Sequence, residues 1–282
     1  MISVKLMGGL GNQMFQYALG RKLSISKKRK LYLDISFYNS QADVDTPRSY
    51  ELEYFKLKAK TIKNITTKKR VPSIINIRPY FPYEYTEKTF SYDGNVFKQP
   101  DGTLYIGYWQ SEKYFLDIRD ELLRDFQLAN PLRGRDKDLL DSILAHDSVS
   151  LHVRRGDYVN NKNAKNFHGT KGVGYYSEAL EIILKKVSNF KLFVFSDDIS
   201  WCKSNLKDIH ADTYFVDGER HGTIDMFLMK NCTHNIIANS SFSWWAAWLN
   251  TNPEKLVVAP KKWFNNTLID TSDIIPNSWI QI

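Results

Sequence analysis

Cysteine and long apolar runs are scarce in this sequence. Its 282 residues include only two cysteines, Cys202 and Cys232, too few for a disulfide framework or a four-ligand zinc site. We interpret both as reduced thiols in a core. No run of about 18 or more apolar residues occurs, which excludes a transmembrane helix. The amino-terminal stretch MISVKLMGGLGNQ lacks the apolar core and cleavage site of a secretory signal, so we expect a cytoplasmic protein.

Acidic residues are outnumbered by basic ones. Lys and Arg number 39 and Asp and Glu 31, which gives a formal net charge of +8. Such an excess suits nucleic acid, an anionic lipid surface or a phosphorylated small substrate. We find no nucleic-acid-binding motif and expect no nucleic-acid partner. One basic cluster, residues 27–30, either contacts phosphate or membrane or ends a helix in solvent, where cations suit the helix dipole.

Strand and helix patterns alternate along the chain. The first 35 residues predict a strand, a glycine loop, a helix and a second strand. The second half predicts strands at SVSLHV, KLFVFS, TYFV, HNIIA and KLVVAP, with helices between them. This alternation predicts parallel α/β sheets covered on both faces, which bind ligands at the carboxyl ends of their strands. Residues 40–105 predict loops and short elements, residues 111–126 a helix, and residues 130–147 the linker between two halves.

A glycine-rich turn, Gly8-Gly9-Leu10-Gly11-Asn12-Gln13, joins the first strand to the first helix. Glycines let the backbone approach a phosphate, and the helix N-terminus favours its negative charge. Asn12 is a candidate to cap this helix. A dinucleotide fingerprint is one alternative, because Asp34 ends the next strand where a ribose-binding acid would lie. It requires a third glycine where this chain has Met14. A tight structural turn is the other alternative.

Two adjacent arginines follow the strand SVSLHV, in the motif HVRRGDY. Side chains alternate along a strand, so His152 and Arg154 share one face and Arg155 points away. We expect Arg154 to bind a diphosphate, a task that suits a bidentate and permanently charged group. Arg155 would pair with a carboxylate such as Asp157. A structural ion-pair corner is the alternative interpretation.

Two further constellations lie at predicted strand ends. In FSDD, Asp197 or Asp198 could accept two hydrogen bonds from a guanine edge, or could cap the next helix. In NSSFSWW, Ser240, Ser241 and Phe242 open a helix, where hydroxyls and backbone N–H groups would form a second phosphate cradle.

Metal motifs occur only in unsuitable surroundings. The D-x-D matches Asp43-Val44-Asp45 and Asp136-Lys137-Asp138 lie in polar stretches without a preceding apolar strand. We interpret both as chance matches and expect no metal site. The His residues form no close pair on one helix face, and no P-loop is present.

Taken together, the motifs resemble the α-1,2-fucosyltransferases, the bacterial-type glycosyltransferase family 11. GGLGNQMFQYA, PRSYELEYF, GYWQSEKYF, HVRRGDY, the pair His168-Gly169, FSDD and DMFLMKNCTHNIIANSSFSWWAAWLN follow the family's order along nearly the whole chain. The resemblance implies a GT-B-like fold, with two Rossmann-type α/β domains facing each other across a cleft. We place an acceptor-side domain at residues 1–143 and a GDP-fucose-binding domain at residues 144–282, with the last ~20 residues a candidate to pack back on the first domain.

The resemblance also assigns roles to individual residues. Arg154 matches the arginine that holds the donor β-phosphate, with His152 on the same strand face, and Asp197 and Asp198 match the acidic pair near the guanine. The remaining donor contacts are Gly11 and Asn12 in the first domain and Ser240, Ser241 and Phe242 in the second. More distant fucosyltransferases carry a proposed glutamate base where this chain has Lys162. Asp157 and His168 are therefore our candidate bases, and His168 has the more suitable intrinsic pKa.

The activity implied by the resemblance is inverting transfer of L-fucose from GDP-β-L-fucose to the 2-hydroxyl of a galactoside. Direct displacement would leave an α-1,2 linkage and need neither a metal nor another cofactor. The expected acceptor is a galactose-terminated oligosaccharide, free or lipid-linked, in surface-polysaccharide (O-antigen) synthesis. A lipid-linked acceptor would bring the enzyme to the inner membrane face as a peripheral protein. The alternatives are a fucosyltransferase of another linkage or acceptor, and an NAD-dependent oxidoreductase.

Overall fold

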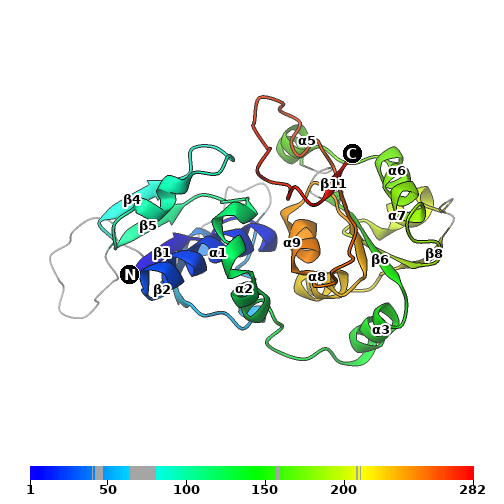
Figure 1. The fold of residues 1–282 in the computed structure, drawn as a ribbon, viewed down its shortest axis with the longest axis horizontal. Helices are drawn as coiled ribbons and strands as arrows, with labels where there is room; N and C mark the ends of the chain where they lie inside the picture. The colour runs from blue at the N-terminus through cyan, green and yellow to red at the C-terminus, as the bar shows by residue number, and fades with distance from the viewer. Residues whose placement is uncertain are drawn as a thin grey trace. The chain divides into compact units, whose positions relative to one another are not determined.

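The chain folds into two compact units (Figure 1). The computed structural model describes residues 1–39, 41, 47–63, 81–156, 159, 161–207, 209 and 211–282. The first unit contains Met1–Ala129 and Ile269–Pro276, and the second contains Asn130–Leu268 and Asn277–Ile282. The chain therefore returns to the first unit for a short segment before it ends in the second.

The first unit holds a parallel five-stranded sheet in the order β3-β2-β1-β5-β4. Its strands are β1 (Ile2–Lys5), β2 (Leu31–Asp34), β3 (Lys60–Ile62), β4 (Tyr83–Thr86) and β5 (Thr103–Ile106). Its α-helices are α1 (Leu10–Lys27) and α2 (Arg119–Asp125), and its 3-10 helices are η1 (Ser36–Asn39), η2 (Leu52–Tyr54), η3 (Gly94–Lys98), η4 (Glu112–Tyr114) and η5 (Leu116–Ile118). The strand, glycine turn, helix and strand predicted for the first 35 residues are therefore present.

Helix α1 packs closely on the first sheet. Its apolar residues recur at helical spacing, and Met14, Ala18 and Leu23 are fully buried. A Cβ atom at Gly20 would lie 2.7 Å from Leu31 Cδ1 and 2.8 Å from Val4 Cγ2. A glycine at this position thus lets the helix approach β1 and β2, and the position of α1 sets the position of the glycine turn before it.

The second unit holds a parallel six-stranded sheet in the order β11-β10-β9-β6-β7-β8. Its strands are β6 (Ser148–Val153), β7 (Lys191–Ser196), β8 (Asp212–Phe215), β9 (His234–Ile236), β10 (Val257–Ala259) and β11 (Ile280–Gln281). Its helices are α3 (Gly134–Leu144), α5 (Lys162–His168), α6 (Val173–Leu184), α7 (Ile199–Asn205), α8 (Gly222–Lys230) and α9 (Ser241–Leu249). All five strands predicted for this half are present, and β11 adds a sixth that the pattern did not indicate.

The predicted linker at residues 130–147 is wrong. Most of this stretch forms α3, which packs on α8 in the second unit. Asp136 of α3 also forms an ion pair with Arg220, with 3.0 Å between Arg220 Nε and Asp136 Oδ1, and the Arg220 side chain is only 6% exposed. Because these contacts tie α3 to the second unit, the chain divides after Ala129 rather than after residue 143.

Helix α9 forms the most aromatic part of the second core. Trp244, Trp245 and Trp248 are all buried, and the rings of Trp244 and Trp248 stack with 12° between their planes. Trp279, near the chain end, packs on Trp244 with 5.5 Å between ring centroids. These contacts hold the start of α9 in place at the sheet edge. In the described ranges, no helix is both long and apolar enough to cross a membrane.

Candidate functional site

The second sheet collects several predicted site residues at one edge. Val153 of β6 lies opposite Ser196 of β7, and Leu151 of β6 lies opposite Ile236 of β9. The three strands are parallel neighbours, so their carboxyl ends meet along the same edge. The segments that leave this edge carry Arg154 and Arg155, Asp197 and Asp198, and Ser240 to Phe242.

Arg154 is held by Asp197 across this edge. Arg154 Nη1 lies 2.7 Å from Asp197 Oδ2, and both side chains are about one-quarter exposed, at 23% and 27%. The other carboxylate oxygen, Oδ1, accepts a 2.8 Å hydrogen bond from the backbone N–H of Arg155. A Cβ atom at Gly156 would lie 2.6 Å from Asp197 Oδ2. Glycine at position 156 thus leaves the space in which the carboxylate orients the guanidinium.

Arg155 takes different partners. Its Nε lies 3.1 Å from Asp198 Oδ2, and its guanidinium carbon lies 4.1 Å from the centroid of the Trp201 ring. The alternation of side chains along a strand predicted that Arg154 and Arg155 point in opposite directions. In the structure the two arginines bind different carboxylates, Asp197 and Asp198. The partner proposed for Arg155, Asp157, lies outside the described residues, and the carboxylate that pairs with Arg155 in the structure is Asp198.

Asp198 also caps α7. Its Oδ1 accepts a 3.1 Å hydrogen bond from the backbone N–H of Trp201, and its own N–H donates to Ser196 Oγ at 2.9 Å. The helix-cap interpretation of this aspartate therefore holds. Each carboxylate oxygen of Asp197 and Asp198 already has one partner in the protein. A guanine bound by either residue would therefore hydrogen-bond to the remaining lone pairs of these oxygens.

His152 is buried beneath the same edge. It is 5% exposed, and its ring centroid lies 5.3 Å from that of Phe242. Burial lowers the pKa of His152 to about 4; the Arg154 guanidinium also lowers it, and Asp197 opposes both. The imidazole is therefore neutral at neutral pH. Its buried Nδ1 atom has no hydrogen-bond partner among the residues that the structure describes. A buried nitrogen of this kind can hold a polar ligand group.

The start of α9 offers backbone donors at the same edge. Ser240 precedes the helix in an extended conformation, and its carbonyl accepts from Trp244 N–H at 3.0 Å. Across the described residues, no side chain caps this helix. The first N–H groups of α9, which include those of Ser241 and Phe242, therefore point out of the helix, with the positive end of its dipole.

Asn239 begins the NSSFSWW motif but was not among the predicted site residues, and it connects the His168 segment to this edge. Its Nδ2 donates to the backbone carbonyls of His168 at 2.9 Å, Gly169 at 3.3 Å and Trp263 at 3.1 Å. Asn239 is 1% exposed, so the His168 segment is anchored beside the start of α9. The His168 ring itself packs with Phe167 and Phe264, at centroid distances of 4.8 Å and 5.5 Å. The sequence signal for Asn239 was its place, as a polar residue directly after the predicted apolar strand HNIIA.

The glycine turn of the first unit differs from the expectation in one respect. Helix α1 begins after Gly9 without a side-chain cap from the described residues. Asn12 does not cap it, because Asn12 lies inside the helix, where its Oδ1 accepts a 2.8 Å hydrogen bond from Gln110 Nε2. Gly8 has a φ of +77°, and a Cβ atom there would lie 2.6 Å from Asn12 Nδ2. The turn therefore requires glycine at position 8.

Gln13 and Arg48 join the glycine turn to the PRSYELEYF segment. Gln13 Nε2 donates to the carbonyls of Gly8 at 3.1 Å and Ser49 at 2.8 Å. The Arg48 guanidinium lies 3.9 Å from the position of a Cβ atom at Gly9. These two motifs, separate in the sequence, thus form one structural element at the carboxyl end of β1. Neither Gln13 nor Arg48 was among the predicted site residues.

Acidic residues do not assemble into a metal site in the described part of the chain. No group of three or more His, Cys, Asp or Glu residues there is arranged to hold an ion. Asp136 of the second D-x-D match pairs with Arg220. Asp43 and Asp45 of the first match lie outside the described residues. The buried Asp34 accepts a 2.9 Å hydrogen bond from Ser36 N–H, as expected of a turn residue.

Comparisons with known proteins agree with these motifs. The family model for glycosyl transferase family 11 matches residues 1–282. An α-1,2-colitosyltransferase of Escherichia coli is 36% identical over 296 residues, which span 100% of this chain and 98% of that protein. The O-antigen biosynthesis glycosyltransferase WbnK of Escherichia coli is 34% identical over 307 residues, 98% of this chain and 99% of that protein. Galactoside α-(1,2)-fucosyltransferase 2 of Rattus norvegicus is 26% identical over 260 residues, 88% of this chain and 67% of that protein.

Among solved structures, the chain is similar to POFUT1 in complex with GDP-fucose. The TM-score is 0.52 at 13% identity, over 90% of this chain and 95% of that one. This likeness concerns the fold, and it confirms the GT-B-like class with two parallel-sheet α/β units. A glycosyltransferase family that matches every residue leaves no place for the oxidoreductase alternative. The chain is a glycosyltransferase and belongs to glycosyltransferase family 11.

Proposed function

We propose that this protein transfers L-fucose from GDP-β-L-fucose to the 2-hydroxyl of a galactoside and inverts the anomeric carbon. The observation that carries the proposal is Arg154, which Asp197 orients at 2.7 Å on the sheet edge where α9 begins. A cation and a helix N-terminus on one edge suit the diphosphate of a nucleotide-sugar donor. Relatives named for α-1,2 transfer support the linkage.

The reaction is a single displacement in this proposal. The acceptor oxygen bonds to C1 of fucose as the bond from C1 to the β-phosphate oxygen breaks, and GDP leaves with the electron pair. Arg154 and the first N–H groups of α9 stabilise the negative charge that grows on GDP. Asp197 holds Arg154 in position before the donor arrives, so little reorganisation accompanies the reaction.

His152 and His168 have separate roles in the proposed mechanism. Burial lowers the pKa of His152 to about 4, so this imidazole is too weakly basic to take the proton of the acceptor hydroxyl. Its Nδ1 atom instead accepts a hydrogen bond from the bound GDP-fucose. The acceptor proton goes to His168 or Asp157. In the first unit, Gly11 and Asn12 remain predicted to contact the GDP-fucose donor.

The direct test supplies purified protein with GDP-β-L-fucose and lactose. We expect stoichiometric GDP release and a trisaccharide with fucose α-linked to O2 of galactose, identified by NMR. A β-linkage, or attachment at another hydroxyl, would contradict the mechanism or the linkage. GDP release without a new oligosaccharide would contradict transfer to a galactoside.

A second candidate donor is GDP-colitose, because one relative at 36% identity is named for colitosyl transfer. Colitose is fucose without its 3-hydroxyl. A site that hydrogen-bonds this hydroxyl rejects the deoxy sugar strongly, because its buried polar groups would lose their partner. Competing the two donors for lactose in one reaction decides between them. A higher kcat/KM for GDP-colitose would replace fucose in our proposal and leave the displacement mechanism unchanged.

Activity is expected to persist after exhaustive dialysis against EDTA. In the proposed mechanism Arg154 and the α9 N-terminus do the electrostatic work that a divalent ion does in other glycosyltransferases. The measurement is the initial rate before and after chelation, with and without added Mg²⁺ or Mn²⁺. Loss of activity that either ion restores would contradict this prediction and return attention to Asp43 and Asp45.

Replacement of Asp198 by asparagine is expected to raise the KM for GDP-fucose and to reduce the preference for GDP over ADP. Asparagine still caps α7 but cannot accept both guanine donors. The loss of a charged acceptor costs about 1.5–3 kcal/mol, roughly tenfold or more in affinity. Asp197→Asn is measured in parallel. Unchanged affinities for GDP and ADP in both variants would mean that guanine is read elsewhere.

The relatives also suggest a cellular setting. One is named for O-antigen biosynthesis, which supports a role in the synthesis of bacterial surface polysaccharide. We add to this proposal a cytoplasmic location and a lipid-linked acceptor. Peripheral binding to the inner membrane face would use the basic cluster of residues 27–30. Two of its members have protein partners, because Lys27 Nζ donates to the Gln99 carbonyl and Arg29 pairs with Asp101 at 2.5 Å. Liposome binding that survives neutralisation of the cluster would contradict this role.

A further inference from the structure

The carboxyl edge of the first sheet brings two turns together. Strands β1 and β5 are parallel neighbours; the glycine turn of residues 8–13 follows β1, and a turn of residues 107–110 follows β5. Gln16 of α1 joins them, because its Nε2 donates to the Gly107 carbonyl at 3.0 Å and its Oε1 accepts from Met7 N–H at 3.0 Å. Both turns thus lie at the edge where parallel α/β sheets bind ligands.

The 107–110 turn has a strained backbone. Trp109 has a φ of +58°, a left-handed conformation that tryptophan seldom adopts, and its side chain is fully buried. The half-buried carboxyl group of Glu87 holds the turn, because it accepts hydrogen bonds from the N–H groups of Tyr108 at 2.6 Å and Trp109 at 2.9 Å. Backbone strain of this kind persists only where other contacts impose it, and it concentrates at functional sites.

Gln110 presents an unpaired acceptor at the end of this turn. Its Nε2 donates a 2.8 Å hydrogen bond to Asn12 Oδ1, whereas Oε1 of the same amide has no partner in the part of the chain that the structure describes. Gln110 is 7% exposed. A buried acceptor without a donor has lost its bond to water and gained nothing in return. A ligand group that donates a hydrogen bond to Oε1 would recover this loss.

Tyrosines surround the glycine turn at the same edge. The Tyr38 hydroxyl donates to the Gly8 carbonyl at 3.1 Å. Burial raises the pKa of this hydroxyl, and the nearby side chains of Glu51, Tyr108 and Tyr50 raise the pKa further. All three tyrosines are half-buried. Rings of this kind pack against the apolar C–H face of a pyranose, and phenol and amide groups hydrogen-bond its hydroxyls.

The chemistry of this edge favours a neutral sugar. The diphosphate of a nucleotide sugar has no proton at neutral pH to donate to Gln110 Oε1, whereas every sugar hydroxyl has one. We propose that Gln110 is a specificity-determining contact for the acceptor: its Oε1 accepts a hydrogen bond from one hydroxyl of a neutral pyranose, and Asn12 orients the amide. The proposal rests on the proposed function in one respect, since it names this pyranose as the galactoside.

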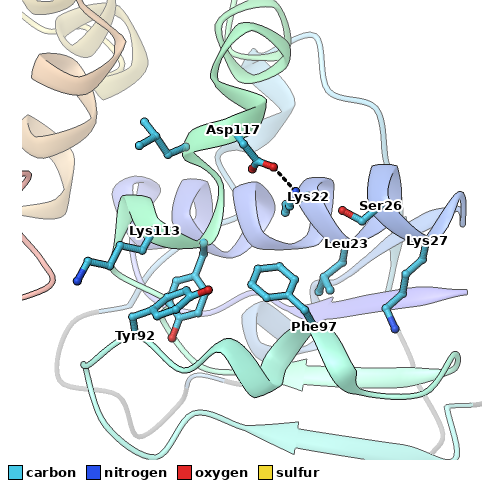
Figure 2. A pocket seen from close by; sticks show the side chains of 10 residues that line it. Lys22, Leu23, Ser26, Lys27, Tyr92, Phe97, Lys113 and Asp117 are labelled. Carbon is cyan, nitrogen blue, oxygen red and sulfur yellow. Dashed lines mark hydrogen bonds and ion pairs between the residues drawn. The ribbon is translucent and has the colours of Figure 1, made fainter.

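An open pocket beside the second half of α1 is a competing place for a sugar (Figure 2). Its volume is about 1000 Å³, and Tyr92 and Phe97 are among the residues that line it. Lys22, which pairs with Asp117 in this pocket, lies about 15 Å along α1 from Asn12. Variants in the pocket and at the sheet edge therefore distinguish the two places.

The test measures lactose binding by ligand-observed NMR titration, with the full chain and no donor present. Gln110→Met keeps the length of the side chain but removes the acceptor, so lactose should bind about tenfold more weakly. Monodeoxy derivatives of the galactose ring identify the hydroxyl that binds Oε1. The derivative without that hydroxyl should bind the unmodified protein and Gln110→Met equally well, because the hydrogen bond is missing in both complexes.

Gln127→Met and Tyr92→Ala are the matched controls. Gln127 is exposed and its Nε2 donates to the Leu123 carbonyl, so it takes no part in either turn, and Tyr92 belongs to the pocket. Both variants should bind lactose as the unmodified protein does. Unchanged lactose binding in Gln110→Met, equal weakening in Gln127→Met, or loss of binding in Tyr92→Ala would overturn the proposal. Equal weakening of lactose and every derivative in Gln110→Met would also overturn it.

Gln110→Glu carries the test if Gln110→Met does not fold. A carboxylate accepts hydrogen bonds more strongly than an amide, so the preference for lactose over the decisive derivative should increase. An unchanged preference would contradict the contact between Gln110 and the sugar.

Steady-state kinetics separate this proposal from the proposed function. In Gln110→Met the KM for lactose should rise about tenfold, and the KM for GDP-fucose should change much less. A raised KM for GDP-fucose with unchanged lactose binding would assign Gln110 to the donor and overturn the proposal. Failure of the unmodified protein to transfer fucose to any galactoside, with lactose binding still dependent on Gln110, would contradict the proposed function alone.

Discussion

Replacement of Arg154 by alanine should lower kcat about 10²–10³-fold, the usual cost of losing one preorganised charge partner of a transition state. Arg155→Ala should act mainly on stability. The reason is the geometry at the end of β6, where Asp197 orients Arg154 at 2.7 Å on the sheet edge. Arg155 instead pairs with Asp198, at the cap of α7, and stacks on Trp201. The measurements are kcat at saturating donor and the unfolding midpoint of both variants.

Arg154→Lys is the matched control for charge. Lysine keeps the positive charge but loses the planar fork of donors, so its activity should lie between those of the unmodified protein and Arg154→Ala. Equal losses of kcat in Arg154→Ala and Arg155→Ala, with both variants fully folded, would contradict the assignment of the two arginines to different faces.

Gly156→Ala should lower kcat about 10²-fold, although position 156 carries no chemical group. The added Cβ would lie 2.6 Å from Asp197 Oδ2, closer than Cβ atoms of folded proteins approach non-bonded atoms. The carboxylate must then rotate away, and Arg154 loses the partner that orients it. The chain around Gly156 keeps its fold if only this short side chain moves. We therefore expect a large loss of rate with a small shift in the unfolding midpoint.

A double-mutant cycle tests this explanation. In an Asp197→Ser background the clash is removed, so the further change Gly156→Ala should have little additional effect on kcat. Fully additive losses would show that Gly156→Ala damages the site by another route. Unchanged kcat in Gly156→Ala alone would mean that the orientation of Asp197 does not matter for catalysis.

Secondary structure in the second unit was largely predictable, because it depends on local patterns. The strands β6, β7, β8, β9 and β10 are short apolar runs bounded by polar or helical segments, and the helices between them show 3.6-residue spacing. Such patterns can be recognised in a local segment without knowledge of the rest of the chain. The glycine turn before α1 was also predictable from the sequence. Gly8 has a φ of +77°, and because few residues other than glycine adopt this conformation, the glycine itself indicates the turn.

Other elements were misjudged because long-range contacts decide them. Residues 111–126 have helical spacing but form η4, η5 and only a short α2, after Trp109 with a φ of +58°. The charged, Gly-containing stretch 130–147 suggested a linker, yet it forms α3. Arg220, distant in sequence, supplies an ion-pair partner for Asp136 in that helix. Tertiary contacts outweigh local propensity in both regions.

The candidate site divides in the same way between sequence and tertiary structure. The sequence alone determined which residue types gather at strand ends, because the chemistry of arginine, aspartate and glycine follows from their identity and their place in a motif. Only the tertiary structure decided how they pair: Arg154 with Asp197, Arg155 with Asp198, Asn12 with Gln110, and Asn239 with the His168 backbone. These partners lie from 43 to 98 residues apart in the chain. Parallel strand order sets which loops are neighbours, and that order is a property of the folded sheet rather than of any local segment.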